Sequence, residues 1–266
     1  MKFIHLSDLH FHGDPDKNVQ VTNMLAHIRA NYPEHYLIIT GDITDDGDEQ
    51  QYELAYQALK PFCEKERRVF ICPGNHDFGA AGNIYNRETA EKFDTLLSSR
   101  LKQGGTFAGD NMPVVNVVKE NGVNVMLISL DSNRETLHPF DFACGRIGKK
   151  QIEDLDAILS VPSNSVFTKI LFFHHHPFIR VNPLMRMAGH RALMRTVCGR
   201  IDVMMFGHKH KTDYWTDYCG IPHVIASDSS AEPGCIVREI DVSENRIVVN
   251  QLALQLIQIT TNTGGK

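Results

Sequence analysis

The chain has few of the features that mark membrane, secreted or nucleic-acid-binding proteins. No apolar run approaches the length that spans a bilayer, and the N-terminus carries one Lys before a strand-like run. We therefore expect no transmembrane segment and no signal peptide. The six cysteines form no CxxC pair, which favours reduced thiols packed as small hydrophobic groups in a cytoplasmic protein. A net charge of −5 disfavours a sequence-independent nucleic-acid binder, which needs a basic face.

What remains is an ordinary globular composition with one unusual residue type. The 266 residues are 42% hydrophobic and 22% charged, enough for one α/β domain with a large core. Strand-like runs alternate with helical patterns, and residues 214–257 alternate like antiparallel strands. This order predicts one domain over 1–266, with two stacked mixed sheets between helices and a flexible tail at 258–266. The unusual residue is histidine, which occurs 14 times.

Apolar periodicity places the expected elements. Strands are predicted at 2–7, 36–40, 68–72, 114–119, 123–130, 169–173 and 202–206, and helices at 17–31, 48–64 and 149–159, with partly helical stretches over 80–100 and 182–198. Asn121-Gly122 is typical of a hairpin turn. Sites in open α/β sheets gather beyond the carboxyl ends of the strands. Five clusters of polar residues fall at such ends.

The five clusters share one chemistry, because they hold carboxylates, imidazoles and an amide but no thiolate. They comprise Asp8 and His10, then Asp42, then Asn75 and His76, then the histidines at 174–176, and last His208 and His210. Such donors suit Mn, Fe or Zn rather than a soft thiolate site or an all-oxygen calcium site. Seven or more donors are too many for one four-coordinate ion and suit two ions with a bridging carboxylate, for which we choose Asp42.

Each cluster taken alone has a plainer interpretation. An Asp-Leu-His after a strand is usually a turn or a helix cap, and Gly-Asp is usually a turn. Three consecutive histidines can form a partly solvated strand end. Five independent turns are not expected to carry ligand-type side chains by chance, so we favour a joint site.

Together the clusters resemble the conserved blocks of the calcineurin-like metallophosphoesterase family. They occur in the family's order as Asp8-Leu9-His10, Gly41-Asp42, Gly74-Asn75-His76-Asp77, His175-His176-Pro177 and Gly207-His208-Lys209-His210. The resemblance implies a four-layer αββα sandwich that holds two divalent metal ions. It assigns one ion to Asp8, His10 and His210 and the other to Asn75, His175 and His208, with Asp42 shared. His174 and His176 stay open as alternatives to His175.

The resemblance also implies catalytic roles and a substrate class. Asn75 and His76 meet the substrate, His76 contacts the phosphate or the leaving group, and Asp77 positions His76. The finer resemblance is to bacterial class III cyclic-nucleotide phosphodiesterases, through Leu6–His10 and Gly41–Gly47. Protein Ser/Thr phosphatases have Asp-Arg-Gly where this chain has Asp45-Asp46-Gly47, which counts against a protein phosphatase.

The resulting hypothesis is a metal-dependent phosphodiesterase. A hydroxide bridging the two ions attacks phosphorus in a small phosphodiester such as a 3′,5′-cyclic nucleotide. The alternatives are a phosphomonoesterase or nucleotide pyrophosphate hydrolase on the same scaffold, and a non-catalytic binding module. Membrane and nucleic-acid partners are not expected, and an edge near the C-terminus could form a homo-oligomer. The loops expected to set substrate choice are 11–16, 78–85 and 178–190, with Arg180, Arg186, His190 and Arg191 as further contacts.

Overall fold

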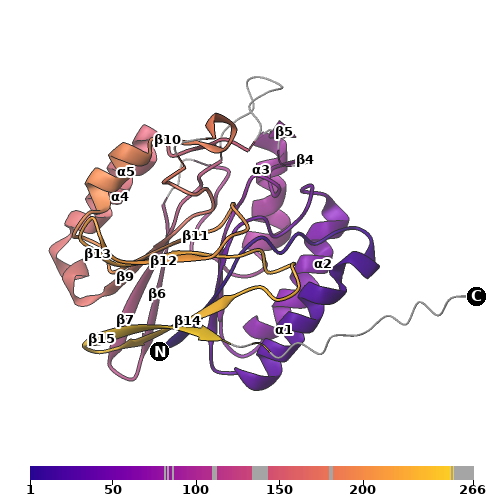
Figure 1. The fold of residues 1–266 in the computed structure, drawn as a ribbon, viewed down its shortest axis with the longest axis horizontal. Helices are drawn as coiled ribbons and strands as arrows, with labels where there is room; N and C mark the ends of the chain where they lie inside the picture. Colours follow the sequence, from indigo (N-terminus) through magenta and orange to yellow (C-terminus); the bar gives the residue numbers. More distant parts are fainter. Residues whose placement is uncertain are drawn as a thin grey trace, which may run out of the picture.

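The computed structural model describes residues 1–80, 82, 84–85, 87–109, 113–133, 143–179, 182–252 and 254. In these residues two large sheets lie between two groups of helices, which confirms the predicted four-layer αββα sandwich (Figure 1). Helices α1 (Val19–Asn31) and α2 (Glu49–Leu59) lie on the side of the first sheet. Helices α4 (Lys149–Ser160) and α5 (His190–Val197) cover the second.

The first sheet is built around three short parallel strands. Its order is β15-β14-β1-β2-β3, with bounds Arg246–Leu252, Val237–Ser243, Lys2–Leu6, Tyr36–Thr40 and Val69–Cys72. Strands β1, β2 and β3 pair in parallel, and β14 pairs antiparallel with β1 and β15. Every residue of β2 and β3 is buried. Burial on both faces explains why these strands read as continuous apolar runs in the sequence.

The second sheet has a parallel centre and antiparallel edges. Its order is β12-β13-β11-β9-β7-β6, with bounds Asp213–Tyr218, Ile221–Ala226, Val203–Phe206, Thr168–Phe172, Val123–Ser129 and Val114–Glu120. Asn121 and Gly122 join β6 to β7 with φ angles of 50° and 81°, as a two-residue hairpin turn requires. The antiparallel strands expected after residue 214 are present, because β12 pairs antiparallel with β13 and β14 with β15, but β13 also pairs in parallel with β11.

The remaining elements are short. They are α3 (Arg87–Phe93), the two-residue strands β4 (Gly79–Ala80), β5 (Ile84–Tyr85), β8 (Gly145–Arg146) and β10 (Met187–Ala188), and single turns at Pro15–Asn18, Lys60–Cys63, Asp94–Ser98, Pro162–Val166 and Pro183–Met185. The two-residue strands are too short to leave a periodic pattern in the sequence. The tail at 258–266 lies outside the described residues, and the assignment of one domain stays a prediction.

Helix α2 shows how local chemistry sets an element's ends. The Asp48 side chain caps its first turn by accepting a hydrogen bond from the Gln50 amide. The helix ends at Leu59, five residues before the predicted end at Glu64. Pro61 explains the difference, because proline has no N–H to donate and clashes with the preceding turn.

Side chains of β9 alternate between two hydrophobic cores. Ile170 and Phe172 belong to the core that includes the space between the sheets, whereas Leu171 and Phe173 belong to the core under α4 and α5. This alternation is the two-residue period of any strand. Continued past the end of β9, it directs residue 174 toward the first sheet and residue 175 away from it.

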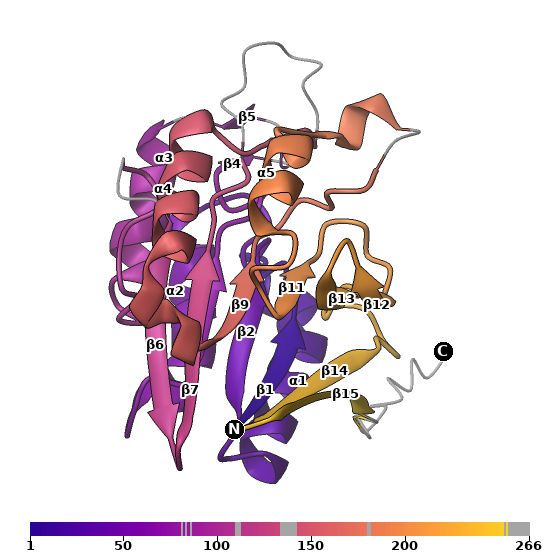
Figure 2. The ribbon, with the colours of Figure 1, turned by 90° about the vertical axis from the view of Figure 1, so that its left-hand side faces the viewer.

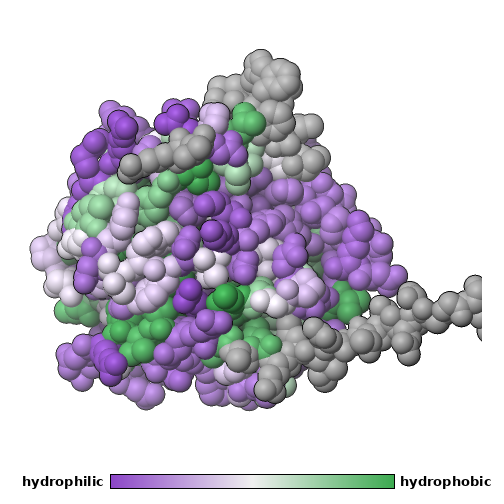
Figure 3. Space-filling model, viewed as in Figure 1, coloured by the Kyte–Doolittle hydropathy of each residue, from purple (hydrophilic) through white to green (hydrophobic). Residues whose placement is uncertain are grey.

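The strand directions bring distant loops together. In Figure 2, β1, β9 and β11 run toward the same edge of the molecule, opposite the N-terminus. On the face seen in Figure 3, apolar residues form separate patches among hydrophilic ones. Within the described part of the chain, no helix has both the length and the apolar character to cross a membrane.

Candidate metal centre

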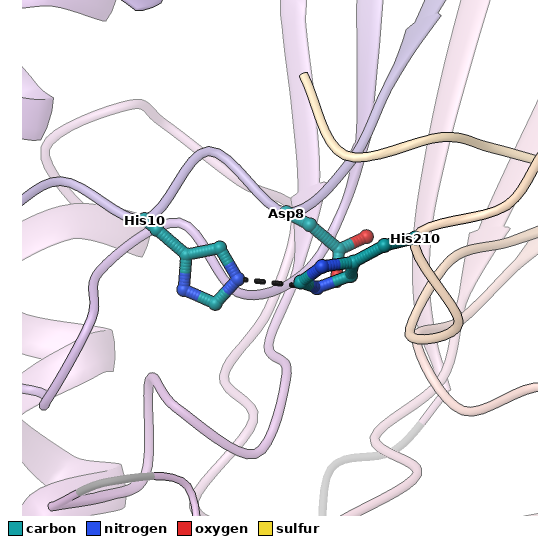
Figure 4. A group of neighbouring side chains, drawn as sticks. All are labelled: Asp8, His10 and His210. Atoms are coloured by element: carbon teal, nitrogen blue, oxygen red, sulfur yellow. Dashed lines mark hydrogen bonds and ion pairs between the residues drawn. The ribbon is translucent and has the colours of Figure 1, made fainter. Parts of the chain in front are cut away.

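Loops after five strands bring most of the predicted ligands together. One group contains Asp8, His10 and His210 (Figure 4), and a second contains Asp42, His174 and His208. Within each group, one ligand atom from each residue lies within 4.8 Å of the others. The loops that follow β1, β2, β9 and β11 supply these residues, and the loop after β3 adds Asn75 to the second group.

The first group surrounds the carboxylate of Asp8. Asp8 Oδ1 lies 3.2 Å from His210 Nε2, which in turn lies 3.4 Å from His10 Nε2. The other carboxylate oxygen, Oδ2, accepts a hydrogen bond from the His208 amide at 3.2 Å. Asp8 is fully buried while the His210 side chain is 45% exposed. The group therefore opens to solvent on the side of His210.

The second group converges on Nε2 of His174. This nitrogen lies 3.1 Å from Asp42 Oδ2, 3.1 Å from Asn75 Oδ1 and 3.1 Å from His208 Nδ1. Nδ1 of the same ring lies 2.7 Å from the Thr40 carbonyl, which only accepts, so Nδ1 carries a proton. A second proton on Nε2 could point at only one of its three neighbours. A cation in place of that proton could bind the His174 nitrogen and all three neighbouring atoms.

The spacing of the donor atoms fits divalent ions. Nitrogen and oxygen ligands lie about 2.1 Å from such an ion, so two of them at an angle of 90–109° are about 3.0–3.4 Å apart. The contacts at His174 and His210 fall at 3.1–3.4 Å. The donor set also fits, because carboxylates, imidazoles and an amide oxygen suit metals of intermediate hardness.

Burial makes the site's electrostatics strongly coupled. Burial alone would raise the pKa of Asp42, but the charge and hydrogen bond of His174 lower it well below the usual range. Burial likewise opposes the charged form of His174, yet Asp42 raises the pKa of that ring to about 9. His10 behaves in the same way, because the hydrogen bond to Asp45 and the charge of Asp42 outweigh burial and raise its pKa to about 9. The buried carboxylates thus favour positive charge beside them.

The backbone is strained at the ligands. Nine non-glycine residues in the described part of the chain have positive φ, and five of them are predicted ligands: Asp8, His10, Asp42, His208 and His210. Left-handed backbone at such residues costs on the order of 1–3 kcal/mol each and tends to cluster at functional sites. Their clustering here favours a functional role for this edge of the sheets.

Glycines beside the ligands allow the loops to approach closely. A Cβ on Gly74 would overlap the backbone nitrogen and Oδ1 of Asp42, and a Cβ on Gly207 would overlap Ser7 Oγ. These close approaches explain the glycine before Asn75 and before His208 without reference to turn conformation.

The structure places His174, rather than the expected His175, in the second group of candidate ligands. The expected His175 counts two residues back from Pro177, whereas the strand alternation of β9 turns residue 174 inward. The His175 ring instead lies against Gly145, and its Nδ1 is 2.9 Å from Ser132 Oγ. His176 is buried against Phe206 with ring centroids 4.6 Å apart. Of the three alternatives left open by the sequence, His174 is the one whose Nε2 joins a group of converging ligand atoms. His175 Nε2 is buried without a hydrogen-bond partner, and the His175 ring lies 4.5 Å from that of His208, centroid to centroid, so the choice of His174 over His175 stays a proposal.

His76 lies beside the first group. Its ring is 4.8 Å from that of His10, centroid to centroid, and its Nδ1 is 2.7 Å from the Asp45 carbonyl. Its amide donates to Asp42 Oδ1 at 2.9 Å. The contact that orients the His76 ring therefore comes from Asp45 and not from the expected Asp77.

The carboxylate of Asp77 instead ties two loops together. It accepts hydrogen bonds from the amides of Ile43, Thr44 and Gly74 at 3.2, 2.8 and 2.9 Å, and from the Thr44 hydroxyl at 3.0 Å. Burial and the charge of Asp42 raise the pKa of Asp77 to about 6 despite these bonds. Asp77 thus fixes the loops that carry Asp42 and Asn75.

Sequence reasoning missed Asp45 and His12, which both contact the site. The Asp45 carboxylate lies 3.3 Å from His10 Nδ1 and 3.1 Å from His12 Nε2. The signal for Asp45 is a second carboxylate three residues after Asp42, in Asp45-Asp46-Gly47. Among the suggested substrate contacts, Arg180 lies outside the described residues, and His190 Nδ1 contacts the nearby Met187 carbonyl at 2.9 Å.

A match to a protein-family model identifies the family of this chain. The model described as Calcineurin-like phosphoesterase matches residues 1–212. The chain belongs to this family. It is accordingly a metal-dependent hydrolase of phosphoric esters. The family implies divalent metal ions, and the two groups described above are candidate sites for them.

Two relatives and a solved structure are similar over most of the chain. The chain is 29% identical over 251 residues to a protein of Rhodococcus erythropolis named probable cyclic nucleotide phosphodiesterase, covering 90% of this chain and 72% of the relative. A Coxiella burnetii protein of the same name is 25% identical over 233 residues, covering 82% and 79%. A dimetal phosphatase from Danio rerio has the same fold, with a TM-score of 0.68 at 15% identity over 94% of this chain and 95% of that one.

We expect Gly74→Ala to abolish most metal binding, because the added Cβ displaces the Asp42 carboxylate. Gly148→Ala is the matched control, since nothing lies within 4 Å of a Cβ at that position. Elemental analysis of both variants, purified in parallel with the wild type, measures the outcome. Wild-type metal content in Gly74→Ala would contradict the close packing described here.

Proposed function

We propose that the protein is a phosphodiesterase that hydrolyses a small phosphodiester, foremost a cyclic nucleotide, with two divalent ions. The observation that carries the proposal is the convergence of two adjoining ligand groups on buried carboxylates at one edge of the sheets. The names of the two relatives support the substrate class. The absence of the arginine typical of protein phosphatases, where this chain has Asp45-Asp46-Gly47, supports it as well.

In this proposal, seven side chains hold the ions. One ion is held by Asp8, His10 and His210, the other by Asn75, His174 and His208, and Asp42 is shared. Bound in this way, the ions supply an activated water and positive charge at the phosphoryl oxygens. Mn or Fe suits these donors best, and Zn is the alternative.

His76 is the residue we assign to the leaving group. Its Nδ1 faces the Asp45 carbonyl and therefore carries a proton, which leaves Nε2 for the substrate. A protonated His76 can donate from Nε2 to the leaving oxygen, and a neutral ring can accept from a substrate hydroxyl. Asn75 lies next to His76 and completes the substrate side of the site. Asp77 acts through the loops that it ties together.

The cellular setting belongs to the same proposal. All six cysteines are free in the structure, which fits a reducing, cytoplasmic compartment. We expect no membrane or nucleic-acid partner. A homo-oligomer would use an exposed strand edge, such as that of β12 or β15.

A substrate panel tests the proposal. Enzyme loaded with Mn²⁺ is assayed on cyclic nucleotides, glycerophosphodiesters, nucleotide pyrophosphates and phosphomonoesters. We expect the highest kcat/KM on the cyclic nucleotides. Preference for monoesters or pyrophosphates would overturn the substrate class, and no turnover of any ester by fully loaded protein would favour a binding module.

The assignment of His174 gives a paired prediction. His174→Ala removes a proposed ligand and should lower metal content and turnover together, whereas His175→Ala should keep the metal because His175 is not among the side chains whose ligand atoms converge. Elemental analysis and circular dichroism on both variants separate metal loss from unfolding. The reverse pattern would show that His175 is the ligand, as expected from its position two residues before Pro177.

The role of His76 predicts a dependence on the leaving group. His76→Ala should keep its metal and lose about 10²–10⁴-fold in kcat, the usual contribution of general acid catalysis. The loss should be largest for a cyclic nucleotide, whose alkoxide needs a proton, and smallest for a nitrophenyl diester, whose phenolate does not. Equal losses on both substrates would exclude proton donation by His76.

A further inference from the structure

One residue, Asp45, contacts three histidines at the site through different atoms. Its carboxylate lies 3.3 Å from His10 Nδ1 and 3.1 Å from His12 Nε2, while its backbone carbonyl lies 2.7 Å from His76 Nδ1. Asp45, His10 and His76 also have ligand atoms within 4.8 Å of one another. The residue thus reaches a proposed metal ligand and the proposed proton donor at the same time.

Asp45 is itself held in place. Its amide donates to the Phe11 carbonyl at 3.2 Å and to Gln51 Oε1 at 3.1 Å. Gln51 is buried on α2, and the preceding residue, Thr44, is anchored by Asp77. A backbone fixed from both sides places the carbonyl and the carboxylate of Asp45 together.

These contacts decide which ring nitrogens carry protons. A carbonyl only accepts, so His76 donates from Nδ1. The Asp45 carboxylate lies 3.3 Å from His10 Nδ1 as an ion pair, which favours a proton on that nitrogen. With a proton on Nδ1, Nε2 of His10 is the nitrogen left to bind a metal ion, on the side where Asp8 and His210 lie. A carboxylate behind a ligating histidine fixes the ring and makes it a stronger ligand.

We propose that Asp45 is a positioning residue that sets the tautomer and orientation of His10 for metal binding and of His76 for catalysis. The inference rests on the proposed function, because it takes His10 as a ligand and His76 as the leaving-group residue. The two effects use different parts of Asp45. His10 depends on the side chain, whereas His76 depends on the main chain.

Because His10 depends on the side chain of Asp45 and His76 on its main chain, Asp45→Asn should affect His10 and leave the contact to His76 in place. It removes the carboxylate behind His10 and keeps the carbonyl that holds His76. Asp48→Asn is the matched control, since it removes the same charge three residues along, where the side chain caps α2. Both substitutions are nearly isosteric.

The experiment is a calorimetric titration of Mn²⁺ into metal-stripped wild type, Asp45→Asn and Asp48→Asn. We expect Asp45→Asn to weaken one of two binding steps by about 10–100-fold, the usual effect of losing such a carboxylate. Asp48→Asn should bind both ions as the wild type does. Equal affinities in Asp45→Asn and wild type would overturn the inference, whereas a wild type that binds fewer than two ions would overturn the proposed function instead.

A second measurement needs no variant. In Zn²⁺-loaded wild type, nitrogen NMR of the histidine rings should show the proton of both His10 and His76 on Nδ1. A neutral ring with its single proton on Nε2, in either histidine, would contradict the role of Asp45. A merely structural role of Asp45 would change thermal stability in Asp45→Asn without moving either the metal affinity or the tautomers.

Discussion

The cost of burying Asp8 and Asp42 is the constraint on which the rest of the site depends. Removing a carboxylate from water is expensive unless positive charge or several hydrogen bonds replace the solvent. Imidazoles from loops far apart in the chain surround both carboxylates, and the mutual pKa shifts of Asp42 and His174 show how strongly the two charges are linked. Divalent ions at the same place satisfy the carboxylates more fully than single protons can. The metal-dependent chemistry of the family fits this electrostatic demand.

The fold brings the candidate ligands together around the two buried carboxylates. Parallel strands in both sheets end at one edge, so the loops after β1, β2, β3, β9 and β11 converge there. The ligands take left-handed backbone conformations that are unfavourable by themselves. Asp77 offsets part of that cost by accepting hydrogen bonds from both the Ile43–Thr44 backbone and Gly74. The site is thus held by buried polar contacts as well as by the packed sheets beneath it.

The sequence predicted the layers and the main strands, because buried strands leave strong apolar runs and ligand-type residues follow them. The division of the candidate ligands into groups around Asp8 and Asp42 came from the family resemblance. The sequence did not separate His174 from His175, since three identical residues carry no composition signal. The phase of β9 could have done so, because Ile170 and Phe172 share the inward side with His174. The parallel pairing of β13 depends on a neighbour, β11, that no local pattern identifies. The part played by Asp45 arises from contacts between loops and from a main-chain carbonyl, for which side-chain chemistry gives no signal.

Anomalous diffraction from crystals of the Mn²⁺-loaded protein tests the central claim most directly. We expect two strong peaks in each chain, one bounded by Asp8, His10 and His210 and the other by Asn75, His174 and His208, with Asp42 between them. A single peak, or a peak against His175 with His174 turned away, would contradict the account.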